Sequence, residues 1–242
     1  LYSLDRSETV TSSYIGDFSY LGGLHTVTDM DVDEVAAFGS LGFNLLENVQ
    51  ATLDARYAKE EKKVKAVDTA LNQGARSEFD NSHSWNMFLP KITIDWRVSD
   101  QNMVYASYAK SEKSGGYNVI TTSGVILPHE RTYEPEKSDN YEIGLKSNFY
   151  DGRYMATLAA FLIDWHDQIV RGLGDSLAVL NTNVGTSTSQ GLEFELTGQP
   201  TDRIGIRLGA AYTDAKYDEY NFDVLETFLG IDPVMDGNPL PL

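Results

Sequence analysis

The sequence has no cysteine, few histidines and few basic residues. Its 242 residues include four histidines, and 19 lysines and arginines stand against 36 aspartates and glutamates, which gives a formal net charge of −17. Without cysteine, no disulfide framework can form. Nucleic acid is not expected as a partner, because phosphate binding requires a surface rich in lysine and arginine. The sequence also contains no Gly-x-Ser-x-Gly motif, so a Ser–His–Asp hydrolase has no support.

Long hydrophobic runs are absent as well, since none approaches the ~20 residues that a membrane helix needs. The hydrophobic fraction of 41% resembles that of a soluble protein. A transmembrane β-barrel, however, exposes only alternate residues to lipid, so its average hydrophobicity stays low. Composition therefore leaves both classes open, and the pattern along the chain has to decide between them.

Apolar and polar residues alternate along several segments. Ile204, Ile206 and Leu208 fall on one face of an extended chain, and Arg207 falls on the other. This period of two predicts strands. The same alternation occurs in residues 49–57, 92–98, 141–149 and 192–197, less cleanly in 34–46 and 102–112, while 153–170 is long and mostly apolar. With one more strand near 10–21, we expect roughly eight or nine strands of about 10–15 residues, as tilted membrane strands require.

Short and long connections take turns between these predicted strands. Short turns are expected at 46–48, 99–101, 151–152 and 200–202, where Asp151-Gly152 is a strong hairpin signal. Long polar connections are expected near 63–84, 113–136, 171–187 and 217–242, the last with a short helix near 222–229. An antiparallel up-and-down transmembrane β-barrel has this arrangement, with short turns at one end and long loops at the other.

Aromatic residues gather near the predicted strand ends. Tyrosine and tryptophan favour a membrane–water interface, which predicts interfacial girdles, although the same residues are also ordinary strand formers. The residues concerned are Trp85, Trp96, Tyr105, Tyr108, Tyr141, Phe149, Tyr150, Tyr154, Trp165, Tyr212 and Tyr217.

Several strings of residues resemble the barrel of TonB-dependent outer-membrane receptors. Each string alone is weak, but together they occur in the order and with the loop alternation of that family. They are 104–109 (VYASYA), 113–118 (KSGGYN), 133–136 (YEPE), 141–146 (YEIGLK), 183–185 (NVG), 190–195 (QGLEFE), 212–217 (YTDAKY) and 237–241 (GNPLP), with Phe161, Asp164, Asp167 and Gln168 between them.

The resemblance implies an all-β fold that is one part of a 22-stranded barrel. Such a barrel is filled by an N-terminal plug and coupled to the TonB–ExbB–ExbD complex of the inner membrane. We expect residues 1–242 to form part of the barrel domain, with both ends cut from a longer polypeptide. The plug, the TonB box and the C-terminal strands are expected to lie outside this chain.

Candidate binding residues follow from the predicted loops and from the polar strand face. Tyr117, Asn118, His129 and Arg131 lie in a predicted outer loop, and loops on a rigid scaffold often carry recognition. The predicted lumen-facing residues, which could contact a plug or a solute but could equally brace the wall, are Arg56, Asp95, Arg97, Glu193, Glu195 and Arg207.

Two constellations of chemistry-bearing residues have simpler structural readings. Asp164, His166 and Asp167 could form a metal cluster, but alternation places Asp167 on the opposite face. Glu193 and Glu195 have a spacing that can serve glycoside hydrolysis, but Arg207 on the next predicted strand offers a cross-strand partner. We therefore expect no catalytic residues, no metal site and no cofactor.

The resemblance implies TonB-dependent import of a scarce solute across the bacterial outer membrane. The solute could be a siderophore, haem, cobalamin or a carbohydrate. Lipid and lipopolysaccharide are expected to surround the barrel. The acidic balance suits lipopolysaccharide with divalent cations in between, or the recruitment of a cationic or metal-bound solute. The alternatives are an uncoupled porin-like channel and an adhesive or structural barrel.

Overall fold

Nine long strands form one antiparallel sheet in the computed structural model, which describes residues 2–14, 24–70, 76–119, 126–175, 178–220, 230, 234 and 236–240. The sheet order is β1-β2-β3-β4-β5-β8-β9-β10-β11, and β6 and β7 form a separate two-stranded ladder. The elements are β1 (Tyr2–Tyr14), β2 (Leu24–Leu46), β3 (Val49–Ala70), β4 (Arg76–Arg97), β5 (Asn102–Lys113), β6 (Gly116–Tyr117), the 3-10 turn η2 (Pro128–Glu130), β7 (Thr132–Tyr133), β8 (Glu136–Phe149), β9 (Tyr154–Leu173), β10 (Val179–Thr201) and β11 (Ile204–Glu219).

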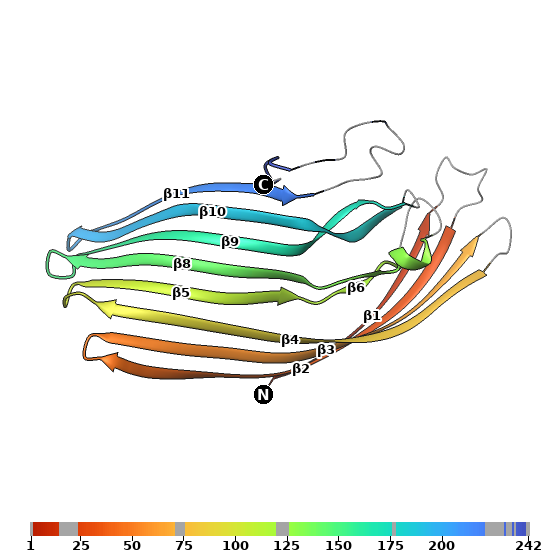
Figure 1. The fold of residues 1–242 in the computed structure, drawn as a ribbon, viewed down its shortest axis with the longest axis horizontal. Coiled ribbons are helices and arrows are strands. Elements are labelled where there is room, and N and C mark those ends of the chain that lie inside the picture. The colour runs from red at the N-terminus through yellow and green to blue at the C-terminus, as the bar shows by residue number, and fades with distance from the viewer. Residues whose placement is uncertain are drawn as a thin grey trace.

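The sheet is open, with β1 and β11 at its edges. The hairpin turns lie together at one end of the long strands, and β6 and η2 lie at the other end (Figure 1). No helix in the described part of the chain has the length and hydrophobicity needed to cross a membrane. The all-β, antiparallel, up-and-down prediction is therefore confirmed as a partial sheet that does not close.

The predicted short turns and the long connection at 113–136 are confirmed, but two other predicted connections are wrong. Strand β3 continues to Ala70 and β4 begins at Arg76, within the expected loop 63–84; β9 continues to Leu173 and β10 begins at Val179, within the expected loop 171–187. In these strand extensions polar residues occur on both faces beside inward-facing apolar residues such as Val64 and Phe79, so their alternation is irregular while the backbone ladder continues.

The start of the chain also differs from the single strand expected near 10–21. It forms β1 from Tyr2 and the start of β2 from Leu24, and the described part of the predicted strand 10–21 ends at Tyr14. The predicted helix near 222–229 lies outside the described residues. The string 237–241, one of those that resemble the receptor family, pairs with β11. The Tyr217 amide donates to the Asn238 carbonyl at 3.0 Å, and the Leu240 amide donates to the Ala215 carbonyl at 2.9 Å.

Ladder partners share a face of the sheet, so the register separates the two faces. We call the face against which residues 114–119 pack the inner face and the other the outer face. One outer rung is Trp96–Val104–Leu145–Leu158–Phe194. The neighbouring inner rung is Asp95–Tyr105–Gly144–Ala159–Glu193.

An apolar band covers the outer face next to the short turns. It consists of the outward-facing residues of 35–45, 49–57, 88–96, 104–108, 141–149, 154–162, 192–198 and 204–212, and none of these described positions carries a charge. Aromatic residues end the band on five strands, and the next outward residue on each is polar. The pairs are Tyr57 and Lys59, Phe88 and Asn86, Tyr108 and Lys110, Tyr141 and Asp139, and Tyr212 and Asp214.

The aromatic prediction is correct for one face only. Trp96, Tyr108, Tyr141, Phe149, Tyr154 and Tyr212 lie on the outer face, and Tyr150 lies in the turn beside it, as interfacial girdles require. Trp85, Tyr105, Trp165 and Tyr217 lie on the inner face, so their assignment to a girdle is wrong. The distance of a residue from the strand end does not determine its face. Its odd or even position along the strand does, because successive side chains point to opposite faces.

Candidate functional site

The connection between β5 and β8 folds onto the inner face instead of away from the sheet. Its described residues, 114–119 and 126–135, are called the strap here. Tyr117 of the strap packs against Val64 and Trp85 of β3 and β4, with the Trp85 ring at 6.2 Å and the Phe79 ring at 5.9 Å, both edge-on. Because burial excludes water from Tyr117, it raises the pKa of its phenol. An apolar cluster therefore fixes the start of the strap.

Glycine at 115 and 116 allows this close approach. A Cβ atom at Gly115 would lie 2.3 Å from the Tyr133 carbonyl oxygen, and one at Gly116 would lie 2.4 Å from the Tyr133 hydroxyl. The two-residue ladder of β6 and β7 pairs Gly116 with Tyr133. The Gly-Gly pair in the sequence thus marks the place where two parts of the strap meet.

A partly buried lysine ties the same end of the strap to β3. The Lys62 ammonium donates to the Ser114 hydroxyl at 2.9 Å and to the Gly115 carbonyl at 2.7 Å. It also lies 3.1 Å from the Glu60 carboxylate and 5.4 Å from the centre of the Trp85 ring. Composition and periodicity do not single out Lys62, because residues 63–84 were expected to form a loop directly after it. Strand β3, which contains Lys62, instead continues to Ala70.

Two asparagines join the strap to β10 by imitating a strand partner. Asn118 donates to the Asn181 carbonyl at 2.7 Å and accepts from the Asn181 amide at 3.0 Å. Asn183 in turn donates to the Glu134 carbonyl at 2.8 Å and accepts from the Glu134 amide at 2.6 Å. Asn183 also donates to the Asp167 carbonyl at 2.8 Å. Each side-chain amide bonds both the backbone N–H and the backbone C=O of one residue, as a partner strand does in a β-ladder.

The strap contains all four residues that the sequence singled out as loop candidates. Tyr117, Asn118 and Arg131 are buried, and the Arg131 guanidinium lies 5.2 Å from the centre of the Phe79 ring. His129 is 64% exposed, and its Nε2 atom lies 3.1 Å from the Asp175 carboxylate in the connection between β9 and β10. Contact with a solute stays a prediction for all four, and only the His129 side chain presents a large free surface.

The other six candidate residues all lie on the inner face. Arg56 forms an ion pair with Glu34 of β2. Asp95 and Arg97 line a small cavity of about 120 Å³ near the short turns. Glu193, Glu195 and Arg207 line a larger cavity of about 510 Å³ together with Tyr105 and Glu142. Their roles toward a plug or a solute stay predictions.

Glu142 and Lys146, two inner-face residues that the sequence did not single out, contact Tyr105 of the larger cavity. The Tyr105 hydroxyl donates to the Glu142 carboxylate at 2.5 Å, and the Lys146 ammonium lies 4.9 Å from the centre of the Tyr105 ring. Glu142 and Lys146 are four residues apart in the alternating string 141–146, so the sequence could have predicted that they share a face. The cavity is acidic overall, since Glu142, Glu193 and Glu195 outnumber Arg207 among its lining residues.

The predicted ion pair between Glu195 and Arg207 is confirmed, but it should contribute little to stability. The Arg207 Nε atom lies 3.5 Å from the Glu195 carboxylate, with side chains 80% and 55% exposed. Exposed pairs typically contribute ~0–1 kcal/mol. We expect Glu195→Ala to lower the free energy of unfolding by less than about 1 kcal/mol in urea titrations of the full-length protein, with Thr197→Ala as the control. A loss of several kcal/mol would mean that the pair is shielded in the assembled barrel.

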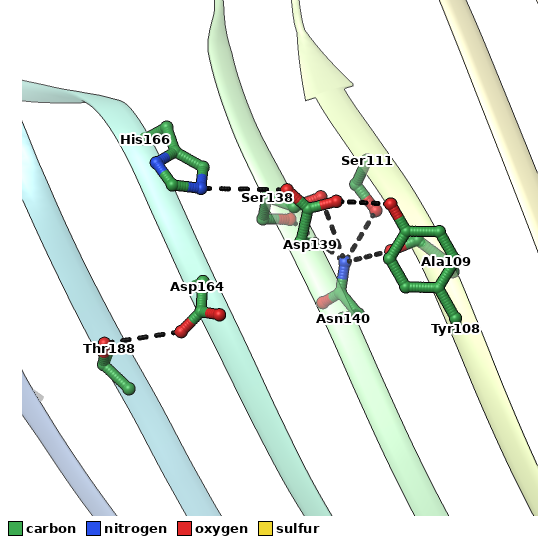
Figure 2. Close-up of polar contacts among 9 residues, drawn as sticks. All are labelled: Tyr108, Ala109, Ser111, Ser138, Asp139, Asn140, Asp164, His166 and Thr188. Carbon is green, nitrogen blue, oxygen red and sulfur yellow. Dashed lines mark hydrogen bonds and ion pairs between the residues drawn. The ribbon is translucent and has the colours of Figure 1, made fainter.

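The outer face beyond the apolar band carries a network of polar contacts around Asp164 and His166. The Tyr108 hydroxyl donates to Asp139 at 2.6 Å, and His166 lies 3.7 Å from the same carboxylate (Figure 2). Asp164 accepts from the Thr188 hydroxyl at 3.5 Å. Asp167 has φ 54°, so its backbone leaves the regular strand conformation. Among the described residues no group of three or more candidate ligands could hold a metal ion.

Comparison with known proteins extends the resemblance over nearly the whole chain. Residues 2–242 match the family model described as TonB dependent receptor-like, beta-barrel. The chain is 25% identical over 214 residues to the probable TonB-dependent siderophore receptor PiuA of Acinetobacter baumannii, covering 85% of this chain and 28% of that protein. It is 26% identical over 148 residues to the metal-pseudopaline receptor CntO of Pseudomonas aeruginosa, covering 61% and 20%.

Solved structures show the same fold. The ferric yersiniabactin uptake receptor FyuA from Yersinia pestis superposes with a TM-score of 0.78 at 17% identity, over 100% of this chain and 34% of that one. The ferric-catecholate import receptor Fiu of Escherichia coli superposes with a TM-score of 0.64 at 16% identity, over 91% and 38%. This chain thus spans about a fifth to two fifths of the length of these relatives. It belongs to the TonB-dependent receptors, β-barrels of the bacterial outer membrane, and forms part of their barrel wall.

Proposed function

We propose that the full-length protein imports a scarce, metal-chelating solute across the outer membrane, driven by TonB. The observation that carries the proposal is the match of residues 2–242 to the receptor barrel. PiuA and CntO, by their names, receive a siderophore and metal-pseudopaline, which favours a metal chelate over cobalamin or a carbohydrate.

The geometry of the chain fits this activity. The apolar band faces lipid, and the polar inner face with its acidic cavity faces the lumen, as in transmembrane barrels. The strap lies at the end with the long connections, which is the extracellular end of such barrels. TonB, ExbB and ExbD would act through the plug, and lipopolysaccharide would surround the outer face beyond the aromatic border. The proposal includes no chemistry on the solute.

Growth under metal limitation tests the proposal. A strain that lacks the full-length gene should lose growth on culture supernatant containing its ferric chelate, and the gene should restore growth only where TonB is present. The matched control is the same strain with iron supplied as a freely diffusing salt, where the gene should make no difference. Growth restored without TonB would replace active import by a passive channel, and unchanged growth and solute binding in every strain would favour an adhesive barrel.

A further inference from the structure

The strap connects two distant parts of the sheet. Its first part is bound to β3 and β4 through Lys62, Trp85 and Tyr117. Its second part is bound to β10 through Asn118 and Asn183. In the sheet order β5, β8 and β9 lie between these attachment points. The strap therefore joins β3 and β4 to β10 on the inner face of the sheet, at the end where β5 ends and β8 begins (Figure 1).

The contacts at both ends are those of a fixed element. Ile126 of the strap is buried with Ala178 and Leu180 beside β10, and Tyr117 is buried at the β3 side. The Asn118 amide group also donates to the Glu130 carbonyl at 2.9 Å, and its backbone amide donates to the Arg131 carbonyl at 2.9 Å. Asn118 thus joins both halves of the strap to each other and to β10. Segments with few buried contacts open easily, and this one has many.

We propose that the strap is a fixed constriction that selects solutes by size before they reach the lumen, and that Asn118 and Asn183 are its positioning residues. The inference rests on the proposed import function, because it assigns a role to the extracellular mouth of the same barrel. Neither asparagine needs to touch the solute. Each holds the backbone N–H and C=O of one residue of the opposite element in place, so that the width of the opening does not fluctuate.

A cysteine reporter below the strap can measure this width without any knowledge of the solute. Ser107 is suitable because it lies on the inner face of β5, lines a cavity of about 350 Å³ and has nearly the shape of cysteine. The chain has no cysteine of its own. In the full-length receptor, with any cysteine elsewhere changed to serine, S107C would be labelled on whole cells with a small maleimide and with a maleimide on a long polyethylene glycol chain.

The expected result is a change in size discrimination. With the native strap, the small reagent should react with S107C and the long reagent should not. In N118A/N183A the long reagent should react about tenfold faster, since each lost pair of hydrogen bonds shifts the opening equilibrium several-fold, while labelling by the small reagent changes little. General loosening of the barrel would instead accelerate both reagents together.

Controls make each outcome decisive. D80C, at an exposed position on the outer face of β4 and outside the strap, should react with both reagents in both backgrounds. If N118A/N183A does not reach the surface, N118D and N183D replace it, because aspartate keeps the accepting oxygen, loses the donor and places a negative charge against the carbonyl oxygens that the amide bonded. Equal access of the long reagent with and without the strap contacts, whether high or low, overturns the proposal. The labelling does not depend on TonB or on uptake, so the import proposal can fail while this one holds.

Discussion

Leu158→Arg is expected to weaken assembly of the barrel in a membrane severely, whereas Thr157→Arg is tolerated. Leu158 lies at the middle of the outward-facing residues of 154–162, and its side chain is 50% exposed on the outer face. It pairs with Leu145 and Phe194, which are apolar as well. An arginine at the lipid midplane of a β-barrel costs roughly 2–4 kcal/mol.

Thr157 is the matched control because it precedes Leu158 and faces inward. It pairs with Glu195, so an arginine there gains a carboxylate within the polar cavity. We expect it to change the free energy of unfolding by no more than about 1 kcal/mol. The measurement is urea unfolding of the full-length receptor in lipid vesicles, together with the fraction that reaches the outer membrane. Similar losses for both variants would show that the inner and outer faces have been assigned the wrong way round.

The faces were predictable from the sequence because only one physical signal fixes them. Where one face contacts lipid and the other contacts water, side chains alternate with period two, and segments such as 141–149 and 192–197 showed this directly. The short turns were equally local, since Asp151-Gly152 provides the positive φ values that the turn between β8 and β9 uses. Fold class and strand order therefore followed from short stretches of residues.

The strand lengths were not predictable, because the regular alternation of apolar and polar side chains ends where the apolar band ends. Beyond Tyr57, β3 presents Lys59, Glu61 and Lys63 on one side and Glu60 and Lys62 on the other. Both faces are polar, so the segment reads as a loop, while the backbone ladder to β2 and β4 continues to Ala70 and Arg76. Hydrogen bonds between backbones leave no trace in the side-chain pattern.

The candidate site was only half predictable for a related reason. The sequence placed Tyr117, Asn118, His129 and Arg131 in one loop and proposed that they face a solute. The structure shows the same loop folded inward, with Tyr117, Asn118 and Arg131 buried. Whether a loop extends outward or packs inward depends on partners far along the chain, here Trp85 and Asn183, and no local pattern encodes such contacts.

Gly191→Ala is expected to destabilise the barrel, and Gly209→Ala to leave it unchanged or slightly more stable. Both glycines lie on the inner face, on the neighbouring strands β10 and β11. A Cβ atom at Gly191 would lie 2.2 Å from the Tyr212 carbonyl oxygen and 2.7 Å from the Phe161 ring, whereas at Gly209 the nearest atom is 3.9 Å away. Overpacking typically costs ~1–3 kcal/mol.

The opposite sign at Gly209 follows from the unfolded chain. Replacing glycine by alanine at an unstrained position reduces the freedom of the unfolded state and stabilises by ~0.4–1 kcal/mol. The two variants therefore make the same chemical change with opposite expected shifts of the urea midpoint of the full-length receptor. A shift of the same sign and size for both would show that the neighbours of Gly191 move aside without cost.

Removing the ring separates the two contacts at Gly191. Phe161 is a side chain that can rotate, but the Tyr212 carbonyl belongs to the backbone of the next strand and cannot move without disturbing the β10–β11 ladder. We therefore expect Gly191→Ala to remain destabilising when it is added to Phe161→Ala. If the ring alone opposed the methyl group, the added change would cost nothing. If the double variant is still less stable than Phe161→Ala alone, glycine is required at position 191 because the backbones of β10 and β11 approach each other closely there. The tight packing of the inner wall at this point depends on that approach.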